Sequence, residues 1–252
     1  MNLFDLTGRV AMVTGSTRGL GETSAKALAK AGADIAVCGR NQADLKRVAS
    51  DIEALGRKSR GFDLDVLSKE KVRSAVEQIL NHFGRIDILV NNAGTNYRVP
   101  VLEYPEEQWD LIINTNLKGY FLVAQAVVPQ MIEREYGKVI NMSSIFGKVA
   151  LANQLAYASS KGGVEQMTKV MAIEWAKKGV RVNAIGPTYF ETEMVKQIRN
   201  DPERFNFINE RTPMGRWGYL PELEGTVIFL AAPASDFITG QTIYVDGGWT
   251  VW

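Results

Sequence analysis

The chain has 252 residues, of which 46% are hydrophobic and 23% charged, enough to bury a large core within a single domain spanning residues 1–252. Its formal net charge of +1 provides no overall field that would recruit nucleic acid or an anionic membrane, so we expect neither as a partner. The lone Cys38 cannot form an internal disulfide, and neither a secretion signal nor a long apolar run is apparent, which favours a cytoplasmic location.

Short β-branched or apolar runs alternate with stretches of helical periodicity along the chain. The runs that predict strands are residues 10–14, 33–38, 59–64, 86–91, 138–143, 180–185 and 242–245. The predicted helices cover about 20–31, 42–55, 69–83, 106–133, 154–177 and 221–232. This alternation predicts an α/β fold, in which a parallel sheet is covered on both faces by helices.

Residues 188–218 interrupt the regular alternation between the sixth strand and the last helix. This segment contains prolines at 202 and 213 and several aromatic residues. Long loops in compact domains are usually functional, so we expect it to be a lid that covers the substrate.

A glycine-rich turn, TGSTRGLG at residues 14–21, follows the first predicted strand and opens the first helix. Such a turn directs backbone N–H groups and the positive end of a helix dipole at a pyrophosphate. Its spacing differs from the common GxGxxG, and a plain structural turn is the alternative. The residues expected to bind a dinucleotide here are Gly15, Thr17, Arg18, Gly19, Leu20 and Gly21.

The end of the second strand bears on the choice of cofactor. An NAD-binding chain would carry an acid there for the ribose hydroxyl, whereas this chain has Arg40. Arg40 and Arg18 could both bind a 2′-phosphate, so NADP(H) is favoured and NAD(H) remains possible. The alternative is that both arginines are ordinary surface charges.

Two further segments lie at carboxyl ends of predicted strands, where ligands of open α/β sheets bind. Asp65 follows the third strand and could accept a hydrogen bond from the adenine amino group, or it could cap the helix that begins near Ser68. The second segment follows the fourth strand and adds Asn92, Ala93 and Gly94 to the expected cofactor site.

Tyr157 and Lys161 are four residues apart on a predicted helix and therefore share one face. A neighbouring ammonium favours the phenolate anion, which would make Tyr157 usable as an acid–base group near neutrality. This pair alone is also compatible with a solvated helix face.

Together with Asn116 in NTNLKGYF, Ser144 in INMSSIFG, YASSK and VDGG, these motifs resemble the classical short-chain dehydrogenase/reductase family over essentially the whole chain. The resemblance implies a seven-stranded, doubly wound Rossmann-like sheet, usually assembled as a tetramer or dimer. It also implies that Ser144 binds the substrate oxygen, Tyr157 exchanges its proton, Lys161 holds the nicotinamide ribose and lowers the tyrosine pKa, and Asn116 positions a water.

Within the family, RTPMGRWG at 211–218 and the C-terminal segment resemble gluconate 5-dehydrogenases and 2-deoxygluconate 3-dehydrogenases. Pro187 and Thr192 are expected at the cofactor, with Thr192 at the nicotinamide carboxamide. Thr188 departs from the family's usual glycine; either the turn differs or this residue never had positive φ.

A small-molecule substrate, most consistent with a sugar acid such as gluconate, is expected. Arg98, on the loop after the fourth strand, could bind its carboxylate, although a solvated loop arginine is the alternative. Tyr189 could stack on a sugar face, line an acyl channel or simply pack the lid.

Two other functions remain open. A 3-oxoacyl-[acyl-carrier-protein] reductase would use a basic patch of Lys138, Lys177 and Lys178 for its acidic partner. A non-catalytic nucleotide sensor on the same fold would not require all four residues Asn116, Ser144, Tyr157 and Lys161.

The remaining expectations concern metals and the chain's end. One histidine, His82, and one cysteine cannot make a zinc cluster, so no metal site is expected and His82 is interpreted as a solvated helix-terminal residue. Trp249 and Trp252 make the C-terminus aromatic, and we predict that they are buried in a subunit interface.

Overall fold

The computed structural model describes residues 2–251, apart from the side chains at positions 194, 196 and 197. Seven parallel strands form one sheet in the order β3-β2-β1-β4-β5-β6-β7. The strands are β1 Val10–Thr14, β2 Asp34–Gly39, β3 Ser59–Asp63, β4 Ile88–Asn91, β5 Gly137–Met142, β6 Val180–Pro187 and β7 Thr242–Val245. Every predicted run forms a strand, and the predicted doubly wound sheet is confirmed.

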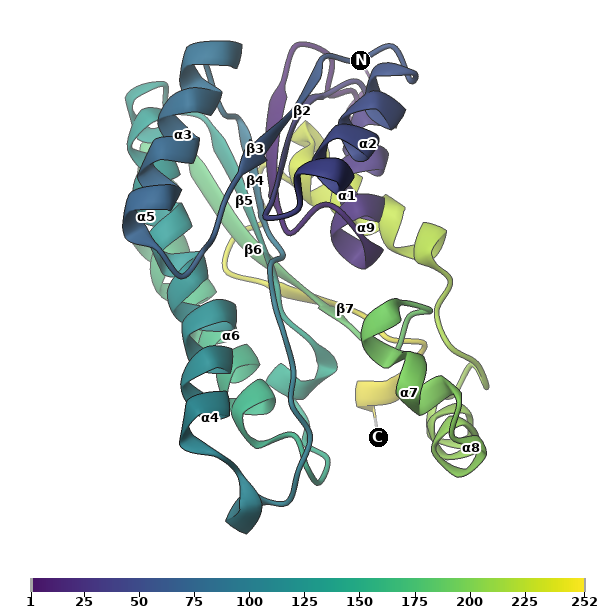
Figure 1. Ribbon diagram of the computed structural model, residues 1–252. Helices are drawn as coiled ribbons and strands as arrows, with labels where there is room; N and C mark the ends of the chain where they lie inside the picture. Colours follow the sequence, from purple (N-terminus) through teal and green to yellow (C-terminus); the bar gives the residue numbers. More distant parts are fainter. Residues whose placement is uncertain (1, 252) are drawn as a thin grey trace.

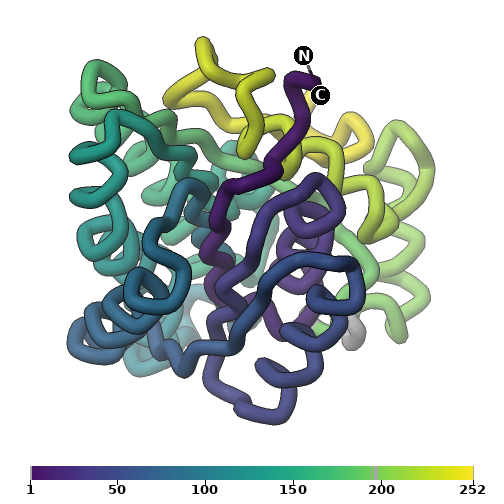
Figure 2. The backbone as a smooth tube through the Cα atoms, turned by 90° about the horizontal axis from the view of Figure 1, so that it is seen from above, coloured from purple at the N-terminus to yellow at the C-terminus, as the bar shows by residue number. Residues whose placement is uncertain are grey.

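Helices cover both faces of the sheet (Figures 1 and 2). They are α1 Gly19–Lys30, α2 Gln42–Glu53, α3 Lys69–Phe83, α4 Glu106–Ile113, α5 Gly119–Glu133, α6 Leu155–Trp175, α7 Lys196–Arg199, α8 Pro202–Arg211 and α9 Glu224–Ala231. In Figure 1, α1, α2 and α9 lie on one side and α3, α5 and α6 on the other. Each face has its own apolar core because the central strands are buried on both sides.

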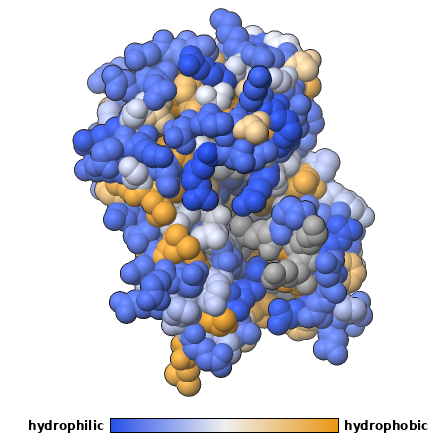
Figure 3. Space-filling model, viewed as in Figure 1, coloured by the Kyte–Doolittle hydropathy of each residue, from blue (hydrophilic) through white to orange (hydrophobic). Residues whose placement is uncertain are grey.

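The predicted helix over 106–133 is continuous but contains a π-helical turn, Asn114–Lys118, between α4 and α5. By length and composition, Glu106–Glu133 could cross a membrane, and half of its most apolar window is buried in the protein. Core helices of soluble proteins pass the same test, so this is weak evidence for a membrane span. Figure 3 shows a face that is mostly hydrophilic, with separate small hydrophobic patches.

The segment 188–218, predicted as a loop, carries helices of its own, α7 and α8. Asp201 caps α8 by accepting from the N–H groups of Glu203 and Arg204, and Pro202 stands at the first helical position. A bridge between Phe190 and Gly218 joins the two ends of the segment. The lid is therefore a closed helical unit beside the carboxyl edge of the sheet.

The burial of Trp249 contradicts the prediction of a subunit interface. Trp249 is fully buried within the chain itself, where its ring lies 5.7 Å from that of Tyr189. Neither residue needs a second subunit to cover it, because the lid supplies the apolar surroundings. The prediction for Trp249 is therefore wrong as stated, and Trp252 lies outside the described residues.

The predicted basic patch is also wrong. Lys138 is 1% exposed, and its ammonium lies 2.7 Å from Asp236 and donates to Ser235. Lys177 and Lys178 are exposed but precede β6, so they lie at the amino edge of the sheet. Elsewhere, Cys38 is fully buried, as predicted. His82 is exposed near the end of α3, also as predicted.

Candidate active site

The glycine-rich turn connects β1 to α1 at the carboxyl edge of the sheet. The backbone φ angles of Gly15 and Gly19 are 61° and 55°, values that residues other than glycine rarely adopt. A Cβ at Gly21 would lie 2.3 Å from the Gly15 carbonyl oxygen, so the helix can start this close only with glycine. Asn92 fastens the turn, because its amide donates to the carbonyl oxygens of Thr14 and Gly15 at 3.0 and 3.1 Å.

The neighbouring residues complete one continuous wall. The Ala93 N–H donates to Thr14 Oγ1 at 3.1 Å, and a Cβ at Gly94 would lie 3.3 Å from Asn116 Oδ1. On the lid side, the Thr192 methyl lies 3.4 Å from the place where a Cβ at Gly19 would stand. The structure thus brings the predicted Asn92, Ala93, Gly94 and Thr192 next to the turn.

The donors at the start of α1 fit a phosphate group. Arg18 is the N-cap residue, and its side chain makes no capping hydrogen bond. The first N–H groups of a helix have no intrahelical acceptors, and the dipole adds positive charge there. This donor set suits the pyrophosphate of a dinucleotide, which Thr17, Arg18, Gly19 and Leu20 would contact.

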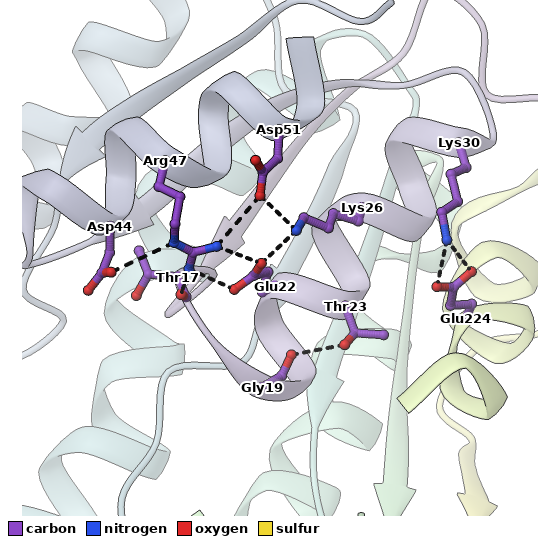
Figure 4. A network of polar contacts seen from close by, with 10 residues as sticks. All are labelled: Thr17, Gly19, Glu22, Thr23, Lys26, Lys30, Asp44, Arg47, Asp51 and Glu224. Carbon is purple, nitrogen blue, oxygen red and sulfur yellow. Dashed lines mark hydrogen bonds and ion pairs between the residues drawn. The ribbon is translucent and has the colours of Figure 1, made fainter. Parts of the chain in front are cut away.

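Three arginines surround this turn, and their partners differ. Arg47 on α2 is occupied: it binds Glu22 on α1 through two hydrogen bonds of 2.9 and 3.0 Å and donates to the Thr17 carbonyl oxygen at 2.8 Å (Figure 4). Arg18 and Arg40 are exposed, and within residues 2–251 neither guanidinium forms a hydrogen bond or ion pair. Two free guanidinium groups therefore remain for a phosphate.

Asp65 does not cap the following helix. Its carboxylate accepts from the Leu67 N–H at 3.1 Å, whereas Ser68 is the N-cap residue and accepts from the Lys71 N–H at 3.2 Å. Asp65 remains half-buried at the carboxyl end of β3. Its contact with adenine stays a prediction.

The predicted proton-transfer residues meet where β5 ends and α6 begins. Ser144, just after β5, is buried, has an extended backbone and lines the same cavity as Tyr157, whose pKa hydrogen bonding from Ser144 lowers. The Lys161 ammonium is buried one helical turn further, 5.6 Å from the centre of the Tyr157 ring. The predicted pairing of Tyr157 and Lys161 on one face of α6 is confirmed.

The electrostatics differ from the prediction for Tyr157. Burial raises the pKa of Tyr157, outweighing the hydrogen bond with Ser144 and the charge of Arg98, which both lower it. Burial also lowers the pKa of Lys161 to about 7. Lys161 is not among the groups that shift the Tyr157 pKa here, because the lysine cation is itself destabilised by burial, so its predicted effect on Tyr157 stays a prediction.

Asn116 lies in the π-helical turn and joins two segments of the site. Its carbonyl oxygen accepts from the Thr95 N–H at 2.9 Å, and its NH₂ group donates to the Thr95 carbonyl oxygen at 2.9 Å and to Ser160 Oγ at 3.2 Å. The side chain thus ties the loop after β4 to α6. Its proposed role in holding a water stays a prediction.

A small cavity of about 70 Å³ adjoins these groups. Arg98, Ser144, Tyr157 and Tyr189 line it, together with Leu20, Asn96, Ile145, Phe146, Pro187, Thr188, Phe190, Thr192 and Val195. Arg98 Nε is buried without a hydrogen-bond partner, and burial lowers the pKa of this guanidinium. An unpaired cation beside Tyr157 suits an anionic group of a ligand.

Tyr189 and Thr188 both line the cavity from the lid, and the predicted contact of Tyr189 with substrate stays a prediction. Burial raises the pKa of Tyr189 to about 12, and its ring packs against Trp217 and Trp249, so it is a packing residue that also borders the cavity. Thr188 is not among the residues with positive φ, so the turn has no glycine-only conformation here. Its hydroxyl is buried in the cavity wall without a partner.

Sequence reasoning missed two buried groups. The Tyr120 hydroxyl lies 3.5 Å from the Lys161 ammonium and donates to the Met142 carbonyl oxygen at 3.3 Å. Glu165 accepts from Ser143 Oγ and from the Tyr244 hydroxyl, both at 2.9 Å. Tyr120 stands four residues after Asn116, a helical spacing that could have pointed to it. Across the described chain, no three His, Cys, Asp or Glu side chains gather in a way that could hold a metal ion.

The fold and this site are those of a nicotinamide-dependent dehydrogenase, and comparisons with known proteins agree. A family model described as enoyl-(acyl carrier protein) reductase matches residues 15–250. The chain belongs to the classical short-chain dehydrogenase/reductase family and is an NAD(P)-dependent oxidoreductase acting on CH–OH groups.

Individual relatives are similar over nearly their full length. A gluconate 5-dehydrogenase of Gluconobacter oxydans is 41% identical over 99% of this chain and 98% of its own. A 2-dehydro-3-deoxy-D-gluconate 5-dehydrogenase of Formosa agariphila is 43% identical over 98% and 95%. The structure of a gluconate 5-dehydrogenase from Burkholderia cenocepacia, in complex with NADP and tartrate, is 41% identical with a TM-score of 0.97, covering 100% of this chain and 98% of that one.

Proposed function

We propose that the protein interconverts a secondary alcohol and a ketone on a sugar acid such as gluconate, using NADP(H). The observation that carries the substrate class is Arg98, whose Nε is buried and unpaired in the cavity that Ser144 and Tyr157 line. Relatives at about 40% identity that act on gluconate or its keto derivatives support the same class.

The residues divide the reaction between them. Arg98 binds the substrate carboxylate and so determines which carbon of the substrate lies next to Tyr157. Ser144 and Tyr157 meet the reacting oxygen, where Tyr157 gives or takes the proton. The nicotinamide, when bound, supplies or accepts the hydride. Lys161, with its pKa near neutrality, provides positive charge that favours the Tyr157 anion when it is protonated.

The choice of NADP(H) over NAD(H) rests on the free arginines. Arg18 and Arg40 flank the turn without ion-pair partners among the described residues, whereas Arg47 is held by Glu22. A 2′-phosphate would pair with the two free groups, and the ribose hydroxyl of NAD(H) would leave both unused. NADP in the Burkholderia relative's complex supports this preference.

The rival acyl-carrier-protein reductase lacks its basic patch. Lys138 is buried in an ion pair, and Lys177 and Lys178 lie at the edge of the sheet opposite the cavity. A carrier protein docked there could not deliver a thioester to Tyr157. A non-catalytic sensor would need neither the Ser144–Tyr157 hydrogen bond nor a buried Lys161.

The assembly is proposed to be a homotetramer or homodimer in the cytoplasm. The half-exposed edge strand β7 and exposed apolar side chains on α5 and α6 provide surfaces for a second copy. Phe121, Val170 and Ile173 are the side chains concerned. Burying them would remove apolar area that a single chain leaves in water.

The test is nicotinamide absorbance with a panel of aldonic acids and both oxidised cofactors, and with a 3-oxoacyl thioester and both reduced ones. We expect a sugar acid to be oxidised with NADP⁺ in preference to NAD⁺, and the Tyr157→Phe variant to lose this turnover. Arg98→Met should raise KM for the acid by about 10- to 100-fold and leave the uncharged polyol of the same chain length unaffected. Turnover of the thioester alone would overturn the proposal.

A further inference from the structure

The substrate cavity contains a polar atom that the proposed function does not use. Asn96 Oδ1 is buried and has no hydrogen-bond partner, and Asn96 lines the same cavity as Arg98 and Tyr157. An acceptor left unpaired in this way costs free energy unless a ligand satisfies it. In the proposed function, Arg98 binds the substrate carboxylate, whereas no donor is assigned to the Asn96 oxygen.

Gln154 holds the Asn96 amide in one orientation. The Asn96 NH₂ group donates to Gln154 Oε1 at 2.9 Å, and Gln154 is buried at the start of α6, the helix that carries Tyr157. With one amide N–H committed to Gln154, the carbonyl oxygen of this cavity-lining residue is buried and lacks a partner. Tyr97, between Asn96 and Arg98, is exposed, so the two cavity residues share the other side of the loop.

We propose that Asn96 is a specificity-determining residue that accepts a hydrogen bond from one hydroxyl of the substrate, between the reacting carbon and the carboxylate. This inference rests on the proposed function, because Arg98 and Tyr157 fix the two ends of the substrate chain. An acceptor-only atom selects an O–H donor and rejects a methylene or a keto group at the same carbon. Gln154 is the positioning residue that keeps the Asn96 oxygen aimed at that hydroxyl.

The test compares gluconate with analogues that each lack one hydroxyl, at carbon 2, 3 or 4, by measuring kcat/KM. In the wild-type protein, kcat/KM for one analogue should be about 10- to 100-fold lower than for gluconate. This is the loss expected when a buried acceptor stays unpaired. In Asn96→Ala the same analogue and gluconate should react equally well. Gln154→Ala removes no atom from the cavity wall. It should lose part of the discrimination in kcat/KM between gluconate and the analogue, because the Asn96 amide can then rotate.

Tyr97→Phe is the matched control, since it removes a hydroxyl from the same loop on its exposed side. It should keep the wild-type discrimination between gluconate and the analogues. The inference is overturned if Asn96→Ala retains that discrimination or lowers kcat/KM for every substrate by one common factor. If the wild-type protein oxidises no sugar acid, the proposed function itself fails and the inference falls with it.

Discussion

The positive charge of Lys161 is disfavoured by its burial in the folded protein but is used in the proposed reaction. Its ammonium is buried, with the Met142 carbonyl oxygen at 2.6 Å and the Tyr120 hydroxyl at 3.5 Å as its polar neighbours. Burial lowers the lysine pKa to about 7, so near neutral pH about half of the molecules carry the cation. The charge that helps Tyr157 is therefore one that the folded state disfavours.

Replacing Lys161 by Met should stabilise the protein while abolishing turnover. At pH 7 we expect the free energy of unfolding to rise by about 1–3 kcal/mol, since a buried, unbalanced cation is removed. The Met142 carbonyl oxygen keeps a donor, because the Tyr120 hydroxyl still reaches it at 3.3 Å. Urea unfolding followed by circular dichroism measures the change, and a less stable variant would show that the lysine contributes more by packing than its charge costs.

The pH dependence of the same pair gives a second test. The native pKa of Lys161 is about 7 and the unfolded value about 10.5, so between these values the unfolded chain binds more protons. Stability from this group therefore rises with pH across that window, by at most about 1.4 kcal/mol per pH unit. From pH 7 to 9.5, the free energy of unfolding of the wild type should rise relative to that of Lys161→Met. A difference in stability between the two proteins that stays constant over this range would contradict the lowered pKa.

The proposed catalytic residues could be predicted from the sequence because the proposed reaction demands their chemistry at fixed spacings. Tyr157 and Lys161 share a helix face whatever the fold does around them. Their pKa values were not predictable, since burial depends on neighbours that are distant in sequence, such as Tyr120 and Met142. Asn96 escaped notice because an asparagine has no signal of its own until Gln154 is seen to hold it.

Among the elements, α1 and α2 are joined by an ion-pair network beside the cofactor turn. Arg47 binds both Glu22 and the Thr17 carbonyl oxygen, while Lys26 pairs with Glu22 and Asp51 without touching the turn (Figure 4). Arg47→Met should weaken NADPH binding by about 3- to 10-fold, since the Thr17 peptide loses its donor.

Lys26→Met is the matched control for Arg47→Met. It removes partly buried ion pairs from the same network, so the free energy of unfolding should fall by about 0.5–1 kcal/mol. NADPH affinity, measured by the change in nucleotide fluorescence, should stay unchanged. Equal loss of affinity in both variants would mean that the network acts through general stability and not through Thr17.

The lid shows where sequence reasoning stopped short. Its length and position predicted a substrate cover, but α8 was not predicted, although Asp201 followed by Pro202 is a helix-start signal. The length of the segment and its prolines at 202 and 213 favoured a loop, and the aromatic C-terminus favoured an interface. The start of α8 was a local signal that went unused, whereas the burial of Trp249 could not be predicted because its packing against Tyr189 joins segments far apart in the chain.

Removing the cap of α8 should loosen the lid without affecting the sheet. Asp201→Ala leaves the N–H groups of Glu203 and Arg204 unpaired, which costs the helix about 1 kcal/mol. Hydrogen exchange should become faster within residues 202–211 and remain unchanged in β1 and β4. Asp201→Asn keeps a capping oxygen and should exchange like the wild type; faster exchange in this variant as well would point to the ion pair with Arg204 instead of the cap.

At the scale of the whole molecule, several apolar side chains on α5 and α6 are exposed. Ile173 on α6 is 81% exposed, and Val170 and Phe121 are more than two-fifths exposed on the same side of the sheet. Isolated exposed apolar residues are common, but several on neighbouring helices indicate an interface. Because the chain's own lid already covers Trp249, we propose the exposed side chains of α5 and α6 as the surface that assembly would bury.

Ile173→Glu should therefore lower the mass of the assembly in solution, from a tetramer to a dimer or from a dimer to a monomer. A carboxylate in the centre of a buried apolar contact has no partner to offset its desolvation, so association weakens. Phe237→Glu is the control, because Phe237 is fully exposed but lies outside α5 and α6. Light scattering coupled to size exclusion measures the mass, and the thermal midpoints of the wild type and of Phe237→Glu should rise with protein concentration more steeply than that of Ile173→Glu. An unchanged mass in Ile173→Glu would place the interface elsewhere, with the half-exposed β7 edge as the next surface to substitute.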